Sequence, residues 1–532
     1  MTNRTHLLIL AAVTLLVYSV SFFNNFVMDD EVIIVNNPQT FSLRHIPDVL
    51  LAPDLIKPYY RPLNRVTYLL DYWIAGMHPA WYHGINIVIH LGNVFLLYLV
   101  CRRLLPDTVA SLFAALIFGI HPVNSEAVNF ISARNTLLAL FFSLASLLAF
   151  MGARERGKRI PVLSALLFFC GLLSKETAFM LVGMIALYTF VPRTGHEEGD
   201  PWGNRMLLLF PYLLLVMVYI AMRSYSLQGI AGIGIPAEGL FHRVSLNYYL
   251  IPRYLGLLLF PVGLTIFHKV PQGGLLNPPW FISAWILLLG MAWLIVRNRN
   301  RAAWFGLAWF VMNYAPISNM IPIPSEQITE RYLYMPAAGF FIALGAIFSW
   351  IPSQERVKHA IWGGAAVVVV ACAALTFQRN LDWRDNISLF SSGVRNDPSS
   401  PAAHYNLGTA FMEKGNLASA GREWERTLEI DPFHADALAQ MGTLAAVKGD
   451  LPAAEQFYMA ALQAPPGRSD PDKSMAHYNL GKIYENWSQP QRALQHYQQF
   501  LNNVPITYLE YKPDVERRMA RLRATIPVAP AR

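Results

Sequence analysis

The chain has 532 residues, of which 54% are hydrophobic and 14% charged, and its formal net charge is +8. A composition this apolar excludes a wholly water-soluble globule and predicts a protein that crosses a membrane several times. The positive charge does not indicate nucleic-acid binding, because Lys and Arg gather in short loops between apolar segments, as membrane topology requires.

Apolar segments long enough to cross the roughly 30 Å hydrocarbon core recur along residues 1–380. The clear ones are 7–27, 82–100, 134–152, 206–222, 280–296, 332–351 and 359–377, and shorter or interrupted ones are 108–121, 161–173, 177–192, 246–267 and 302–315. Segment 246–267 contains Pro252, Arg253 and Pro261, so we predict about eleven to thirteen crossings. Basic clusters at 102–103, 154–159, 297–301 and 356–358 mark cytoplasmic turns. The chain then starts inside, with a retained first helix, and residues 28–80 form an external loop.

An acidic cluster, Asp29, Asp30 and Glu31, directly follows the first apolar segment. A transferase that moves a sugar from a lipid phosphate to a hydroxyl needs a base at the membrane surface, and a carboxylate suits that role. Asp29 or Asp30 is the candidate. The alternative is that these residues only end a helix at the interface, where a charge costs little.

Polar side chains continue through the external loop into the next apolar segment. Tyr60 and Arg61 lie in the loop, and His83, Asn86 and His90 share one face of the helix that follows. Polar residues within a membrane helix face either a neighbouring helix or a water-filled cavity. Both interpretations remain open.

A second external turn contains His121 and Glu126 and is followed by Arg134. His121 and Glu126 could join Asp29 around a metal ion or only hydrogen-bond the turn, and their spacing is not diagnostic.

Two further external turns carry Lys175, Glu176, Arg331 and Tyr332. An Arg at this boundary can bind a phosphate through two parallel hydrogen bonds. The structural alternatives are that Arg331 snorkels or pairs with Glu330, and that Lys175 and Glu176 only form a turn. Four cations nevertheless lie on the external face, against the positive-inside preference, namely Arg61, Arg134, Lys175 and Arg331. This shared exception predicts a phosphate site.

Beyond Asp382 the chain becomes a soluble repeat module. The run 403–408 (AHYNLG) returns at 476–481, and Gly408, Gly442 and Gly481 are separated by 34 (442 − 408) and 39 (481 − 442) residues. This periodicity predicts three tetratricopeptide repeats, whose usual role is to bind a peptide or partner protein. We therefore divide the chain into a membrane domain (1–380), a linker (381–400), repeats (401–510) and a tail (511–532).

The order of these motifs resembles that of the transmembrane and tetratricopeptide-repeat-containing glycosyltransferases, a group that includes eukaryotic O-mannosyltransferases. The resemblance covers nearly the whole chain and implies an all-α, polytopic GT-C membrane fold and a polyprenyl-phosphate sugar donor, with mannose as one candidate sugar. It implies an inverting reaction with Asp29 or Asp30 as the base. Arg331, helped by Lys175, Arg134 or Arg61, would hold the phosphate. The expected substrate-binding residues are Glu126, His121, Tyr60, His83, Glu176 and Tyr332.

The resemblance leaves the metal and the acceptor open. Mg²⁺ or Mn²⁺ is a candidate cofactor, with Asp29, Glu126 and His121 as candidate ligands, because GT-C enzymes differ in metal dependence. The acceptor is a protein or a glycan, since three repeats are fewer than eukaryotic members usually carry. Besides membrane lipid, we expect a protein partner at the repeats and no nucleic acid. The expected location is a bacterial inner membrane with periplasmic repeats, or the endoplasmic reticulum with lumenal repeats in a eukaryote.

A different class of protein fits part of the sequence. A non-enzymatic membrane scaffold or transporter would also carry polar residues within its helices, and broken helices are common in transporters. The charges here gather at one external face rather than in mid-membrane, which favours an interfacial active site.

Overall fold

The computed structural model describes residues 2–54, 59–157, 161–190, 202–227, 239–268, 300–320, 328–350, 354–465, 473–502, 504 and 506–525, and parts of 282–297. All regular structure in these residues is helical, which confirms the predicted all-α class. The chain divides into two compact units, Met1–Asp385 and Asn386–Arg532, and each is described by itself.

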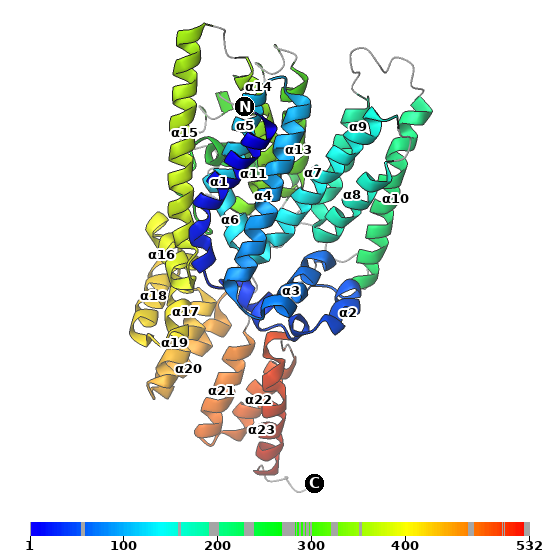
Figure 1. Cartoon of the computed structure of the whole chain (residues 1–532). Helices are drawn as coiled ribbons and strands as arrows, with labels where there is room; N and C mark the ends of the chain where they lie inside the picture. Colours follow the sequence, from blue (N-terminus) through cyan, green and yellow to red (C-terminus); the bar gives the residue numbers. More distant parts are fainter. Residues whose placement is uncertain are drawn as a thin grey trace. The chain divides into compact units, whose positions relative to one another are not determined.

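The first unit is a bundle of long and short helices (Figure 1). They are α1 (Asn3–Val17), α2 (Ile46–Leu51), α3 (Pro62–Ala75), α4 (Pro79–Leu104), α5 (Thr108–Ile120), α6 (Ser125–Asn129), α7 (Arg134–Glu155), α8 (Val162–Ser174), α9 (Leu181–Phe190), α10 (Trp202–Ser226), α11 (Leu240–Leu259), α13 (Arg301–Tyr314), α14 (Tyr334–Phe348) and α15 (Glu355–Asp382).

Several helices are membrane spans by length and composition. Among the described residues, five qualify: Pro79–Leu104, Ile131–Glu155, Arg205–Ser226, Glu330–Phe348 and Arg356–Asp382. A bent pair, Thr108–Ile120 with Pro122–Asn129, qualifies as a sixth, and Asn3–Val17, Val162–Ser174 and Glu176–Phe190 are shorter apolar helices. The chain is therefore a multi-pass membrane protein. The number of crossings stays a prediction, because segment 280–296 lies largely outside the described residues.

Proline positions explain where helices bend or end. The bend of 48° between α5 and α6 falls at His121 and Pro122, because a residue before proline disfavours the helical conformation. Two predicted boundaries are corrected. Helix α1 ends at Val17 and continues as a 3₁₀ turn to Phe23, short of the predicted 7–27 span. Helix α11 accommodates Pro252 and ends at Leu259, so only Pro261 lies beyond it.

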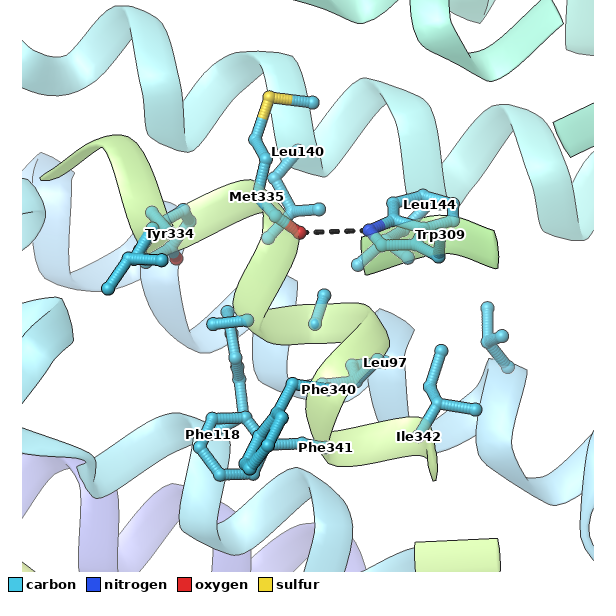
Figure 2. Close-up of a cluster of buried hydrophobic side chains, with 14 of the residues drawn as sticks. Leu97, Phe118, Leu140, Leu144, Trp309, Tyr334, Met335, Phe340, Phe341 and Ile342 are labelled. Carbon is cyan, nitrogen blue, oxygen red and sulfur yellow. Dashed lines mark hydrogen bonds between the residues drawn. The ribbon is translucent and has the colours of Figure 1, made fainter. Parts of the chain in front are cut away.

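Close packing holds α13 against α14. An added Cβ on Gly306 would lie 2.6 Å from the Gly339 carbonyl oxygen, so the two backbones meet where neither has a side chain. Small residues allow membrane helices this approach, in which van der Waals contact replaces the hydrophobic effect. Figure 2 shows the core beside it, where the Trp309 indole nitrogen donates to the Met335 carbonyl oxygen at 2.9 Å.

The second unit is a stack of helix pairs. After α16 (Asn386–Asn396), which falls within the predicted linker, come α17 (Pro401–Glu413) with α18 (Leu417–Ile430), α19 (Ala435–Val447) with α20 (Leu451–Gln463), and α21 (Ser474–Asn486) with α22 (Pro490–Asn502). Helix α23 (Lys512–Thr525) follows.

The three pairs share one internal contact. In each, a glycine of the first helix packs on an aromatic ring sixteen residues later (424 − 408, 458 − 442 and 497 − 481), the pairs being Gly408 with Trp424, Gly442 with Tyr458 and Gly481 with Tyr497. The glycine leaves room for the ring, which fixes how the two helices pack. The predicted tetratricopeptide repeats are confirmed.

The α13–α14 contact makes a testable prediction. Gly306→Ala should destabilise the protein by about 1–3 kcal/mol, because the new methyl group would meet backbone atoms that cannot move aside. Gly363→Ala in α15 is the control, since nothing lies within 4 Å of that position. Thermal unfolding in detergent should show a lower midpoint for Gly306→Ala alone. Equal midpoints for the Gly306→Ala and Gly363→Ala variants would mean that α13 and α14 can move apart without loss of stability.

Candidate functional site

A cavity of about 270 Å³ lies where four parts of the first unit meet. It is lined by the segment between α1 and α4 (Asp29, Ile33, Asn37, Asp54, Tyr59, Arg61, Asn64, Arg65), the start of α7 (Phe130, Ser132, Ala133, Asn135, Thr136), the α8–α9 turn (Lys175, Glu176, Thr177) and the segments around α13 and α14 (Pro316, Ile317, Arg331, Tyr332). Six predicted site residues line it: Asp29, Arg61, Lys175, Glu176, Arg331 and Tyr332.

The two adjacent aspartates occupy different environments. Asp30 is fully buried, and it accepts hydrogen bonds from the backbone N–H and the hydroxyl of Ser132, at 2.7 and 2.6 Å, and from the Val27 N–H at 3.2 Å. Burial raises the pKa of Asp30 to about 7, although these hydrogen bonds oppose the shift. Asp30 therefore ties the loop after α1 to the residues just before α7, behind the cavity wall.

Asp29 faces the cavity instead. Its carboxylate makes no hydrogen bond or ion pair within the described part of the chain. Asp29 is exposed to the cavity, where partial desolvation raises its pKa and the positive charge of Arg331 partly opposes the shift. Met28, the preceding residue, has a φ of 53°, a left-handed conformation that costs a non-glycine residue on the order of 1 kcal/mol. The turn that presents Asp29 is thus held against local strain.

Arg331 is held from behind by Glu126. The buried Glu126 carboxylate forms an ion pair with the Arg331 guanidinium and accepts hydrogen bonds from the Arg331 N–H at 3.0 Å and the Thr329 hydroxyl at 2.6 Å. The guanidinium also lies 5.4 Å from the centre of the Phe130 ring. Glu126 thus positions Arg331 without lining the cavity, and the predicted alternative of an Arg331–Glu330 pair is not observed.

Arg61 and Glu176 form a second ion pair in the wall. The guanidinium donates two hydrogen bonds to the carboxylate, Nε at 3.0 Å and Nη2 at 2.7 Å, and lies 4.1 Å from the centre of the Tyr59 ring. Such bidentate pairs are geometrically specific. The pair connects the start of α3 with the α8–α9 turn and fixes the plane that Arg61 presents to the cavity.

Lys175 differs from the other cations of the cavity. It is 9% exposed, its ammonium donates to the Thr136 hydroxyl at 2.7 Å, and it lies 5.8 Å from the centre of the Tyr332 ring. In the part of the chain that the structure describes, no carboxylate pairs with it. Burial, followed by the charge of Arg61, lowers its pKa to about 7.

The predicted phosphate ligand Arg134 lies outside the cavity lining. It is fully buried and forms an ion pair with Asp71, and it donates to the Asn86 side-chain oxygen at 2.7 Å, the Thr67 hydroxyl at 3.1 Å and the Tyr82 carbonyl at 3.2 Å. These contacts join α3, α4 and α7. Arg134 therefore has a structural position, among buried partners rather than in the cavity wall.

Three other predicted substrate-binding residues also lie outside the cavity lining. The Tyr60 hydroxyl donates to the Leu50 carbonyl at 2.6 Å, and the His83 ring contacts the Asn25 carbonyl at 3.3 Å. His121 Nε2 lies 3.1 Å from the Leu258 carbonyl, and His121 Nδ1 accepts from the Val123 N–H at 3.3 Å. All three side chains hold the backbone around the site.

The candidate metal ligands are not grouped. Among the residues that the structure describes, no three His, Cys, Asp or Glu side chains lie close enough to hold a metal ion. Asp29 faces the cavity, whereas Glu126 is engaged by Thr329 and Arg331 and both ring nitrogens of His121 are used.

Sequence reasoning missed the start of α7 and several loop residues. Ser132, Asn135 and Thr136 line the cavity, as do Asp54 and Arg65, which pair at 3.6 Å. The available signal was the polar run Ser132 to Thr136 between apolar segments. The partner of Arg134, Asp71, carried no signal beyond a lone acidic residue near a membrane segment.

Comparisons with known proteins define the class. The first unit matches the family model for dolichyl-phosphate-mannose-protein mannosyltransferase over residues 83–231, and residues 373–435 match a tetratricopeptide repeat model. A membrane unit that matches a mannosyltransferase model, followed by tetratricopeptide repeats, is the combination that the motif order predicts.

Whole-chain similarities point to particular relatives. Protein O-mannosyl-transferase F38B6.6 of Caenorhabditis elegans is 26% identical over 81% of this chain and 63% of its own length. The human proteins TMTC1 and TMTC4, also named protein O-mannosyl-transferases, are 26% and 27% identical over 82% and 78% of this chain and over 56% and 65% of their own lengths. The predicted resemblance is confirmed. The chain spans about six-tenths of the length of these relatives.

The contrast between the two aspartates predicts different stabilities. Asp30→Asn should lose about 1.5–3 kcal/mol, because the amide cannot accept every hydrogen bond that the buried carboxylate accepts. The Asp29 carboxylate accepts no such hydrogen bonds, so the Asp29→Asn variant should unfold at the wild-type temperature. Thermal unfolding in detergent compares the two directly, and a larger loss for Asp29→Asn would reverse their assignment.

Proposed function

We propose that this chain is a membrane glycosyltransferase that moves a sugar, with mannose the first candidate, from a polyprenyl-phosphate donor to an acceptor hydroxyl. One observation carries the proposal: the cavity contains one unpaired carboxylate, Asp29, together with basic side chains. The names of the relatives and the matched mannosyltransferase model support the same class of reaction.

The basic side chains of the cavity support a donor that contains a phosphate. Three of the four basic side chains have carboxylate partners: Arg61 with Glu176, Arg65 with Asp54, and Arg331 with Glu126. Lys175 is the one of the four that no described carboxylate pairs with. A sugar phosphodiester carries a single negative charge, which one ammonium balances.

The start of α7 adds to the phosphate site. Its first turn, from Arg134, carries no acidic residue, and the 3₁₀ turn Ile131–Ala133 leads directly into it. The dipole of this helix gives its start a partial positive charge of about half a unit, which favours an anion. Ser132, Asn135 and Thr136 present this end to the cavity.

Asp29 acts as the base in the proposed mechanism. The acceptor hydroxyl gives its proton to the Asp29 carboxylate while its oxygen attacks the anomeric carbon from the face opposite the phosphate. The bond between that carbon and the phosphate oxygen breaks, its electron pair leaves with the polyprenyl phosphate, and the sugar inverts. Partial desolvation raises the pKa of Asp29, which makes it a better proton acceptor near neutral pH.

The cations stabilise the leaving group in this scheme. Phosphate gains one negative charge as the bond breaks, so donors already in position lower the barrier more than they strengthen ground-state binding. Lys175 would contact the phosphate, and Arg331 and Arg61 are held by their carboxylate partners at fixed positions in the same wall.

The repeats complete the proposal. Tetratricopeptide repeats bind peptides and proteins on their concave side, so we assign them the presentation of a protein acceptor or the recruitment of a partner. The positions of the basic clusters support an external location for both the site and the repeats. In a bacterium this side is the periplasm, and in a eukaryote it is the lumen of the endoplasmic reticulum.

Replacement of Asp29 tests the transferase directly. Purified protein in detergent is given a panel of radiolabelled polyprenyl-phosphate sugars, with and without a chelator, and sugar release or transfer is measured. Asp29→Asn should lower kcat by roughly 100- to 10,000-fold, the usual contribution of a general base. Folded wild-type protein that turns over no donor would instead favour a scaffold or transporter, and loss of activity with the chelator would assign a role to a divalent cation.

Lys175 predicts a pH dependence of donor binding. Its pKa is about 7, so the fraction that carries the positive charge falls as the pH rises above 7. The KM for the donor should therefore rise with pH, by at most about tenfold per pH unit. A bound phosphate stabilises the charged ammonium and so raises the pH at which this increase begins. Lys175→Arg stays charged and should give a flat profile. The exposed Lys414→Arg is the control and should keep the wild-type profile; a flat wild-type profile would contradict the assignment.

A further inference from the structure

Helix α15 contacts the part of the cavity wall that carries Arg331, on the side away from the cavity. Glu330 and Arg331 are consecutive, and they form ion pairs with different parts of the chain: Arg331 with Glu126, and Glu330 with Arg379 of α15, at 3.7 Å. Glu330 also accepts a hydrogen bond from the Thr265 N–H at 2.6 Å. Two adjacent residues are thus held by different partners, Arg331 by Glu126 and Glu330 by Arg379 and the Thr265 N–H.

A second line of contacts connects the same helix to the same wall. Trp383, which ends α15, is fully buried and stacks on Phe130, with ring centres 6.0 Å apart and planes 28° apart. The Arg379 guanidinium lies 5.9 Å from the centre of the Trp383 ring. Phe130 also contacts Arg331, whose guanidinium lies 5.4 Å from the centre of its ring.

These contacts close into a ring. It runs from Glu330 to Arg379, Trp383, Phe130 and Arg331, and returns to Glu330 through a peptide bond. Phe130 and Arg331 line the cavity, whereas Glu330, Arg379 and Trp383 are buried and do not. Arg379 and Trp383 are four residues apart and therefore lie on one face of α15.

We propose that Arg379 and Trp383 are positioning residues for the donor phosphate, because they fix Phe130 and Arg331 in the cavity wall. The inference rests on the proposed function and deepens it, since neither residue would touch the substrate. A preorganised cation contributes more to phosphate binding than a mobile one, as the cost of ordering it is already met in the fold.

The surroundings of Arg379 fit this role. Besides Glu330, it pairs with Asp382 at 3.1 Å, so the arginine stays charge-balanced if either contact loosens. A cation over the face of a tryptophan adds a further directional restraint. The Trp383 ring is thereby held against the Phe130 ring, which the Arg331 guanidinium contacts.

Binding of farnesyl phosphate, a soluble one-phosphate lipid, to the purified full-length protein tests the inference. Trp383→Leu removes the stacked ring, and Arg379→Met removes the charge while keeping most of the volume. Each should raise the Kd about tenfold, which corresponds to a loss of about 1.4 kcal/mol in binding free energy. Trp383→Phe and Arg379→Lys keep the ring or the charge and should bind nearly as wild type. The double variant Arg379→Met with Trp383→Leu should bind little more weakly than either single variant, because both residues act through the same contacts.

Thr376→Val is the matched control on the same helix. Its hydroxyl is buried and donates to the Ile120 carbonyl at 2.6 Å, so the substitution costs stability without touching the ring of contacts. It should lower the thermal unfolding midpoint and leave the Kd unchanged. A Kd within about twofold of wild type for Trp383→Leu and Arg379→Met would overturn the inference, as would equal weakening by Thr376→Val. Failure of the wild-type protein to bind farnesyl phosphate would instead overturn the proposed function.

Discussion

Charges in an apolar protein at a membrane boundary must be paired, and this constraint organises the first unit. An unpaired buried ion costs several kcal/mol, whereas a pair with good geometry and further hydrogen bonds is tolerated. Arg134 with Asp71, Arg61 with Glu176, and Arg331 with Glu126 each meet that condition, and each joins different parts of the chain. The remaining groups of the cavity, Asp29 and Lys175, then acquire chemical significance because the rest of the local charge is already compensated.

The same constraint separates neighbouring residues that look equivalent. Asp29 and Asp30 are adjacent, yet Asp30 accepts the hydrogen bonds from Ser132 and the Val27 N–H, whereas Asp29 is directed into the cavity. Lys175 and Glu176 divide in the same way, one toward Thr136 and the other toward Arg61. Glu330 and Arg331 do so as well. In the pairs Asp29–Asp30 and Glu330–Arg331, one residue holds the fold and its neighbour lines the cavity, whereas Lys175 and Glu176 both line it with different partners.

The buried polar contacts also explain why the site lies among several helices rather than on one loop. Asp30 connects the segment after α1 to Ser132, Arg134 connects α7 to α3 and α4, and Arg379 with Trp383 connects α15 to the same wall. A cavity built this way is rigid because moving any wall breaks a buried pair. Rigidity of the binding groups is what electrostatic stabilisation of a leaving phosphate requires.

The sequence by itself determined the helical class, the membrane unit, the repeats and the set of charges at one face. Hydrophobic runs, repeated glycines and the positive-inside rule depend on residues close together in the chain, so they can be read without a structure. Only the tertiary structure decided which of those charges are available. The partner of Asp30 is 102 residues away and that of Glu126 is 205 residues away, and no local pattern predicts such pairs. Six predicted site residues line the cavity. The other six do not, because whether a polar side chain faces a cavity or a buried partner is set by which helices pack against it; they are Asp30, Glu126, Arg134, Tyr60, His83 and His121.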